Sequence, residues 1–344
     1  MALAGKKVAK QILGELPLTA ELYWQLRQNG KPLSTSFSLK RTEKWLPIWR
    51  SQASAAAHGA SPGKRVVIFA TLRYWIEHAV LMGSAMAGLG NQVTLAYLPY
   101  ANWRKPITNF DLRRQNAYSH KVLDQAAPIL DCVSLLDIKS NQTLPPSLER
   151  AVQEVSTRDV QYTLQIEDVD RESELYKLRL QRNRQAAQTS LAWLGKTRPE
   201  VVITPNGSIL EMGVVYQVAK CLDLPVVTYE FGEQRNRIWL AQNAEVMNQE
   251  TDDLWAARKD SPLDQSQWEQ AQTLFTSRQS ADLWANFSRR WQGLPNQGGQ
   301  QVRAQLGLDD VSPEARPVVL LAANVIGDSL TLGRQVFTDS MTEW

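Results

Sequence analysis

Residues 65–99 read RVVIFATLRYWIEHAVLMGSAMAGLGNQVTLAYLP, and this stretch decides the fold class of the chain. Its segment 66–72 is a continuous run of β-branched and apolar residues, which is typical of a strand buried on both faces of a parallel sheet. Apolar residues then recur at helical spacing over 75–89, and two glycines stand where that helix would end. A second apolar run follows at 92–98. The stretch therefore predicts a strand–helix–strand unit with a right-handed crossover, which implies parallel strands.

A second unit of the same kind lies further along the chain. Its segments are predicted as a strand at 200–205, a helix at 210–222 and a strand at 225–231. Between the two units, 132–138 is predicted as a further strand and 171–195 as a long polar helix. Because strands alternate with helices, we expect an α/β fold with a Rossmann-like parallel sheet and flanking helices.

Changes in composition along the chain predict four segments. They are a helical N-terminal extension at 1–62, a Rossmann-like domain at 63–250, a helical and linker segment at 251–314, and the first strand and helix of a second Rossmann-like domain at 315–344. The strand VVLLAA in the last segment is similar to VVIFAT in the first unit. Because few residues follow it, we expect the second domain to be truncated and the chain to be a fragment of a longer protein.

The composition excludes several classes of protein. Of the 344 residues, 43% are hydrophobic and 21% charged, which is typical of a globular protein and not of a disordered chain. A net charge of +3 gives no argument for a nucleic-acid partner. Two cysteines, Cys132 and Cys221, cannot form a disulfide framework and suggest a reducing compartment. Most of the 12 tryptophans fall in predicted helices, so we interpret them mainly as packing residues.

The N-terminus lacks the features of a secretory signal, and no apolar stretch is long enough to cross a bilayer. We therefore expect a cytoplasmic protein. Residues 1–30 are predicted to pack on the domain, while a basic amphipathic helix against the inner face of the membrane stays open as an alternative.

Familiar catalytic motifs are absent from the sequence. No predicted strand is followed by G-x-G-x-x-G, and there is neither a P-loop nor a G-x-S-x-G elbow. The histidines and cysteines have no zinc spacing, so we expect no metal site. Asp168 and Asp170 form a D-x-D pair, which would hold a metal if 160–166 were a strand. We favour the alternative, an acidic turn before the 171–195 helix.

The loops at the carboxyl ends of the predicted strands carry polar residues, and ligands of open α/β sheets bind at such ends. The candidates are Arg73, Tyr74 and His78 after the first strand, Asn206, Gly207, Ser208 and Glu211 after the 200–205 strand, and Glu230, Glu233, Arg235 and Arg237 after the 225–231 strand. A carboxylate or histidine there is suited to act as a general base towards a hydroxyl. Helix capping by Asn206 or Ser208 and pairing of Glu230 with Arg235 remain open as alternatives.

Three stretches carry a resemblance to a known family. Residues 204–240, TPNGSILEMGVVYQVAKCLDLPVVTYEFGEQRNRIWL, resemble the second half of the N-terminal domain of GT-B glycosyltransferases, and more narrowly of bacterial capsule and cell-surface polysaccharide transferases. Residues 65–99 resemble the first strand–helix unit of that domain, including its A-x-x-G-x-x-V-x-L passage. Residues 317–344 resemble the start of the C-terminal domain. The family's glycine-rich first loop is replaced here by Thr71–Trp75.

The resemblance implies transfer of a sugar from a nucleotide-sugar to an acceptor hydroxyl. The partners would be a nucleotide-sugar donor as co-substrate and a glycan or lipid-linked acceptor, with no metal or other cofactor and no nucleic acid. The implied base candidates are, in order, Glu230, Glu211 and His78. Anionic groups would meet Arg73, Arg235 and Arg237, and the donor phosphate would approach a loop made of Asn324, Gly327, Asp328 and Ser329.

Two other classes of function remain open. One is a sugar-nucleotide epimerase or hydrolase on the same fold, and the other is a non-catalytic module that binds a carbohydrate or a partner. Tyr74, Trp75 and Trp239 are the aromatic residues that we expect to be placed for sugar stacking.

Overall fold

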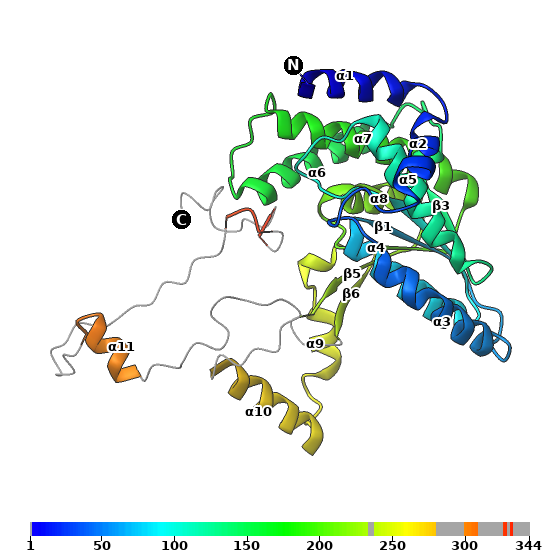
Figure 1. The fold of residues 1–344 in the computed structure, drawn as a ribbon. Coiled ribbons are helices and arrows are strands. Elements are labelled where there is room, and N and C mark those ends of the chain that lie inside the picture. The colour runs from blue at the N-terminus through cyan, green and yellow to red at the C-terminus, as the bar shows by residue number, and fades with distance from the viewer. Residues whose placement is uncertain (1, 233–236, 280–298, 309–325, 329–330, 333–344) are drawn as a thin grey trace. The chain divides into compact units, whose positions relative to one another are not determined.

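The computed structural model describes residues 2–232, 237–279, 299–308, 326–328 and 331–332 (Figure 1). The chain divides into two units, of which the first comprises Met1–Tyr229, Leu240–Gln249 and Val325–Trp344, and the second Glu230–Trp239 and Glu250–Asn324. The candidate functional site lies in the first unit.

In the described part of the chain, six strands form one open sheet. They are β1 (Arg65–Thr71), β2 (Gln92–Leu98), β3 (Leu130–Ser134), β4 (Val201–Pro205), β5 (Val226–Phe231) and β6 (Ile238–Gln242). Their order is β3-β2-β1-β4-β5-β6, and the pairs from β3 to β5 are all parallel. The prediction of an α/β fold with an open, mostly parallel sheet and flanking helices is therefore confirmed.

The sixth strand was not predicted from the sequence. Strand β6 runs antiparallel to β5, because the N–H of Gly232 donates to the carbonyl of Arg237 while the N–H of Asn243 donates to the carbonyl of Val226. Its residues are exposed or half-buried. It therefore lies at an edge of the sheet. An edge strand does not need the long run of buried apolar residues that identifies the other strands in the sequence.

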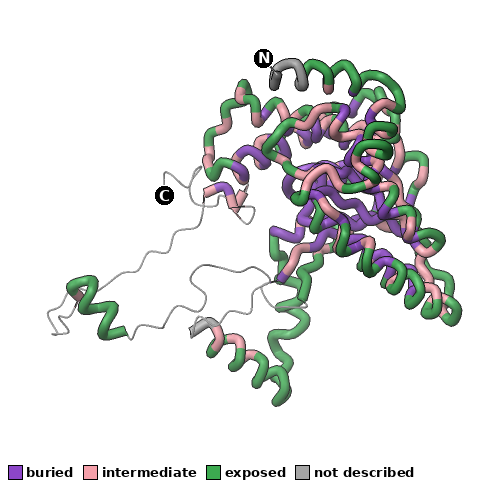
Figure 2. The backbone as a smooth tube through the Cα atoms, viewed as in Figure 1, coloured by how far each residue is buried: buried purple, intermediate pink, exposed green. Residues whose placement is uncertain are grey.

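Helices of the first unit cover both faces of the sheet. They are α1 (Ala2–Glu15), α2 (Thr19–Gln28), α3 (Lys40–Ala57), α4 (Arg73–Gly88), α5 (Asn109–Leu123), α6 (Pro146–Leu164), α7 (Glu174–Thr197) and α8 (Leu210–Cys221), with single 3-10 turns η1 (Asp124–Ala126), η2 (Leu135–Asp137) and η3 (Val246–Asn248). The second unit holds α9 (Asp252–Arg258), α10 (Gln265–Gln279) and α11 (Gly299–Gln305). Buried residues gather on the strands and on the helix sides that face them (Figure 2).

The core lies between the sheet and its two helical layers. Every residue of β1 after Arg65 is buried, which explains its unbroken apolar run. Helix α4 packs closely on one face because Gly83 has no side chain; a Cβ there would lie 3.0 Å from Leu130 Cδ1. Helices α7 and α8 pack against each other and against α6, and α8 contacts β1 and β4.

Three of the strand predictions made from the sequence have different outcomes in the structure. The alternative strand at 160–166 is wrong, because α6 extends to Leu164 with buried residues at helical spacing. The strand predicted at 132–138 begins at Leu130 and ends at Ser134, where η2 follows. The strand VVLLAA lies outside the described residues.

The predicted N-terminal extension, 1–62, forms α1, α2 and α3. Helices α1 and α2 pack on α5, and α3 packs on α4, all within the first unit. Among the described residues, no helix has the length and apolar character to span a bilayer.

Candidate functional site

The carboxyl ends of β1 and β4 lie at the point where the strand order reverses. The chain leaves β1 through α4 towards β2 on one side, and leaves β4 through α8 towards β5 on the other. In open parallel sheets this switch point opens a crevice in which ligands bind. The candidate site is therefore built from the residues that follow these two strands.

The backbone at this edge adopts conformations that L-residues rarely take. Buried Leu72 has φ 63° and ψ 149°, a region populated almost entirely by glycine. After β4, Asn206 has φ 58° and Gly207 has φ 85°. A Cβ on Gly207 would lie 2.6 Å from Thr228 Cγ2. Strain like that of Leu72 clusters at functional sites, whereas a positive φ is unstrained for glycine and common for asparagine.

His78 of α4 and Tyr229 of β5 form a polar pair at this edge. His78 Nδ1 lies 3.2 Å from Tyr229 Oη, and the ring centroids are 5.3 Å apart. Trp75 packs edge-on against the same tyrosine at 5.4 Å. Burial lowers the pKa of His78, so its imidazole is neutral at pH 7. His78 was predicted from the sequence and Tyr229 was not.

We expect His78 to make the protein less stable in mild acid. Its pKa is lower in the folded than in the unfolded chain, so as pH falls below about 6.5 the unfolded chain takes up a proton that the folded chain refuses. The free energy of unfolding should therefore decrease from about pH 7 to about pH 5, and His78→Gln should reduce that decrease. Denaturant unfolding across this range measures both.

His120 provides a control of opposite sign. Its hydrogen bond from Nε2 to Asp137, 2.7 Å long, raises its pKa. Its stabilising contribution is present at low pH and is lost as pH rises through the folded pKa. His120→Gln should therefore make the free energy of unfolding decrease more steeply as the pH falls. An unchanged pH slope in His78→Gln would contradict the prediction.

The loop after β4 is held by hydrogen bonds to neighbouring elements. The N–H of Asn206 donates to the Tyr229 carbonyl at 2.7 Å, and Asn206 Oδ1 accepts from the N–H of Ser208 at 3.0 Å. Ser208 Oγ donates to Glu245 Oε2 at 2.7 Å, and Arg158 pairs with the same carboxylate at 3.1 Å. Asn206 and Ser208 thus shape the loop and do not cap α8 directly.

A buried charged network underlies α8. Arg179 of α7 donates from Nε to Asp159 Oδ2 at 3.0 Å and from Nη2 to Glu211 Oε1 at 2.8 Å. Asp159 also accepts from the Leu210 N–H at 2.5 Å, and so caps the start of α8. Burial lowers the pKa of Arg179, but Glu211 and Asp159 outweigh it and raise the pKa, so the guanidinium stays charged. Glu211, a predicted base candidate, is therefore bound in an ion pair.

Arg182 and Tyr100 extend this network towards the end of β2. The Arg182 guanidinium stacks on the Tyr100 ring at 4.3 Å and donates to the carbonyls of Asn102 and Lys105, each at 2.8 Å. Burial, with a smaller effect of Glu211, raises the pKa of Tyr100 to about 12. Its hydroxyl is therefore protonated at neutral pH and is able to donate a hydrogen bond.

Sequence reasoning missed Arg179, Asp159 and Tyr100. One signal was available for the arginine: Arg179, Arg182 and Asn183 recur at helical spacing on one side of α7, and all three are buried. Polar residues on the inward side of a helix indicate a buried network.

The other predicted site residues lie in different places. Arg73 and Tyr74 begin α4 and are exposed, with the Tyr74 ring 5.3 Å from Trp75. Glu230 and Arg237 belong to the second unit, where Glu230 Oε1 accepts from the Phe231 N–H at 3.0 Å. Glu233, Arg235, Asn324 and Ser329 lie outside the described residues.

Gly327 and Asp328 lie in the first unit. A Cβ on Gly327 would lie 2.2 Å from the carbonyl oxygen of Gln161, so the glycine packs directly on the last turns of α6. The Asp328 carbonyl accepts from the N–H of Thr331 at 2.8 Å. This glycine therefore serves close packing on a helix in the described part of the chain.

The acidic pair Asp168 and Asp170 lies in the turn between α6 and α7. Both residues are exposed, and Asp170 Oδ1 accepts from the Glu172 N–H at 2.8 Å. This agrees with the preferred interpretation of an acidic turn before a helix. Across the described residues, no group of three or more His, Cys, Asp or Glu side chains has an arrangement that would hold a metal ion.

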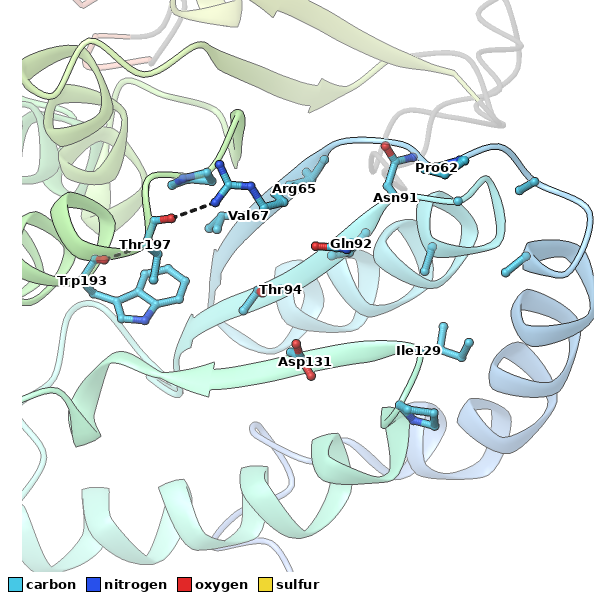
Figure 3. Close-up of a pocket in the computed structure, with 18 residues that line it drawn as sticks. Pro62, Arg65, Val67, Asn91, Gln92, Thr94, Ile129, Asp131, Trp193 and Thr197 are labelled. Carbon is cyan, nitrogen blue, oxygen red and sulfur yellow. Dashed lines mark hydrogen bonds between the residues drawn. The ribbon is translucent and has the colours of Figure 1, made fainter.

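A hollow of about 530 Å³ lies at the opposite, amino edge of the sheet (Figure 3). It is lined by the starts of β1 and β2, including Arg65 and Gln92, and by Trp193 and Thr197 near the end of α7. Arg65 Nη1 donates to the Thr197 carbonyl at 3.4 Å across its wall. Because the strained backbone, His78 and the buried network all lie at the carboxyl edge, we place the candidate site there.

Comparison of the chain with protein-family models, with curated proteins and with solved structures found no match.

Proposed function

We propose that the chain is the acceptor-binding part of a GT-B glycosyltransferase, which transfers a sugar from a nucleotide-sugar to a hydroxyl of a glycan or lipid-linked acceptor in surface polysaccharide synthesis. One observation carries the proposal: a neutral histidine, His78, is paired with Tyr229 beside strained backbone at the switch point of the sheet. The resemblance of 65–99 and 204–240 to that family supports the same function.

In the proposed reaction His78 is the proton acceptor. The acceptor oxygen bonds to the anomeric carbon, the bond from that carbon to the nucleoside diphosphate breaks with its electron pair on the phosphate oxygen, and the hydroxyl proton passes to His78. A base must be unprotonated at working pH, and the lowered pKa of His78 meets this requirement. Glu211 is bound to Arg179, so we assign it a positioning role.

Exposed residues at the rim would meet the ligand first. Arg73 supplies a guanidinium for an anionic group of acceptor or donor, and Tyr74 supplies an aromatic face for a sugar ring. Glu230 and Arg237 belong to the second unit and stay predictions from the sequence. No metal takes part in the proposed step.

In the complete enzyme, with both its acceptor-binding and donor-binding parts, we expect His78→Gln to lower turnover by about 10²- to 10⁴-fold, because it removes the proton acceptor. Tyr229→Phe should reduce turnover less and shift the acidic limb of the pH–rate profile, because it removes the hydroxyl beside Nδ1. Release of nucleoside diphosphate from a panel of UDP- and GDP-sugars, with and without oligosaccharide acceptors, is the measurement.

The matched control is His58→Gln. His58 is exposed and its Nδ1 lies 2.8 Å from the Ser54 carbonyl at the end of α3, so turnover should not change. Full activity in His78→Gln would remove His78 as the base. Product formation without an acceptor would favour the epimerase or hydrolase alternative.

A non-catalytic carbohydrate-binding module is the second candidate. The observation that favours it is that three carboxylates of the first unit near this edge, Asp159, Glu211 and Glu245, are each bound by an arginine. Calorimetric binding of an oligosaccharide with no turnover of any donor in the panel would support this candidate.

A further inference from the structure

A ridge of leucines stands on the outer side of α2. Leu18, Leu22 and Leu26 are 67%, 53% and 74% exposed. Leu22 and Leu26 lie one turn apart on one side of α2, and Leu18 is the residue just before the helix, with φ 61°. Single exposed leucines are ordinary, but three at four-residue intervals, one just before and two on a short helix, form an apolar surface that requires a partner. We call Leu18, Leu22 and Leu26 the leucine ridge.

The opposite side of α2 is already used by the fold. Arg113 of α5 pairs with Glu21 at 2.5 Å and donates to the carbonyl of Gly14 at 2.9 Å. Tyr23 packs edge-on against Phe110 at 5.5 Å. These contacts fix the α1–α2 hairpin on α5. The leucine ridge therefore stays on the outer side of a rigidly held helix.

Apolar surface continues on α1 and on the loop before α5. Val8 and Ile12 are both exposed and lie one turn apart on α1. Ile12 also lines a hollow of about 710 Å³ together with Pro106 and Ile107. Exposed apolar residues therefore occur on α1 as well as on α2, and Ile12 borders a recess.

Exposed cations lie close in the sequence to this apolar surface. Residues 1–31 contain five lysines and arginines against two glutamates, and one of these, Glu21, is paired with Arg113. Arg27 and Lys31 are exposed at the end of α2, and Arg104 and Lys105 are exposed just before Pro106 in the chain, whereas Glu15 lines the Ile12 recess. An apolar ridge with a basic margin is the chemistry of a surface that lies on anionic lipid.

We propose that the α1–α2 surface docks on an anionic lipid bilayer. The leucine ridge enters the interfacial region, and the cations lie against the lipid phosphates. Charge complementarity selects the bilayer over a second copy of the chain, because two such surfaces would bring their basic residues together. The surface is distinct from the candidate site at His78, so docking and the proposed activity can fail separately.

Flotation of the full chain with vesicles tests the proposal. The chain should bind vesicles of phosphatidylglycerol mixed with phosphatidylcholine, bind phosphatidylcholine alone more weakly, and lose binding as salt rises. Leu22→Ser with Leu26→Ser should lower the partition coefficient at least about tenfold. Arg104→Gln with Lys105→Gln should weaken binding to the anionic vesicles and leave binding to phosphatidylcholine unchanged.

Leu89→Ser is the matched control, because Leu89 is 73% exposed at the end of α4, outside this surface. It should bind vesicles like the parent chain, and thermal unfolding should show that all variants are folded. Failure of the parent to float, or equal binding by the Leu22 and Leu26 variant, would overturn the proposal. A dimer that this variant converts to a monomer, with no vesicle binding by the parent, would show that the surface joins two copies instead.

Discussion

Arg179→Met is expected to destabilise the protein by about 3–5 kcal/mol. The methionine fills a similar volume but leaves the carboxylates of Asp159 and Glu211 buried without their cation. A buried charge that loses its partner keeps its full desolvation cost. Guanidinium chloride unfolding, followed by far-UV circular dichroism, measures the change in the free energy of unfolding.

Two controls separate a buried network from an ordinary ion pair. Arg184 lies on the same helix and pairs with Glu149, with side chains 42% and 29% exposed, so Arg184→Met should cost less than about 1 kcal/mol. Adding Asp159→Asn and Glu211→Gln to Arg179→Met removes the charges of all three residues and should recover part of the loss. Equal losses from the Arg179 and Arg184 variants would show that burial does not set the strength of the pair.

The network matters for the candidate site because it joins three helices beneath the carboxyl edge. Asp159 lies on α6, Arg179 on α7 and Glu211 on α8. Asp159 also holds the first N–H of α8, so this helix start is already occupied by a carboxylate. An anionic ligand at the crevice would therefore meet Arg73 at its rim before the α8 terminus.

Much of the sheet could be predicted because its strands are buried. The run 66–72 has to be apolar on both faces because every residue of β1 after Arg65 is buried, and β2 matches its predicted range of 92–98. An exposed edge strand such as β6 is under no such constraint. The end of β3 at Ser134 was missed because Leu135 and Leu136 continue the apolar run into η2.

The candidate site could be predicted only in part. A strand end followed by a helix locates His78, because the helix begins where the strand stops. The partner Tyr229 is 151 residues away, and its apolar ring is indistinguishable from a core residue in the sequence. The positive φ of Leu72 could not be predicted either, because this conformation is usually adopted by glycine and nothing in the sequence indicates it at a leucine.

Gly207→Ala is expected to destabilise the protein by about 2–4 kcal/mol. The residue has φ 85°, and its new Cβ would lie 2.6 Å from Thr228 Cγ2 and 3.6 Å from Glu245 Cα. Backbone strain and overlap therefore add together at one position. Gly59→Ala is the control, since no atom lies within 4 Å of a Cβ there and the change should be neutral or slightly stabilising.

The two contributions at Gly207 can be measured separately. Thr228→Ser removes Cγ2 and keeps the hydroxyl that donates to the Ala244 carbonyl at 2.7 Å. In the double variant Gly207→Ala with Thr228→Ser, the new Cβ no longer overlaps with Cγ2, but the strain of the positive φ remains. Only part of the lost stability should therefore return. A double-mutant cycle by denaturant unfolding gives the coupling between the two positions. Zero coupling would mean that the glycine is required for its backbone conformation alone, whereas the contact with Thr228 predicts a coupling of about 1–3 kcal/mol.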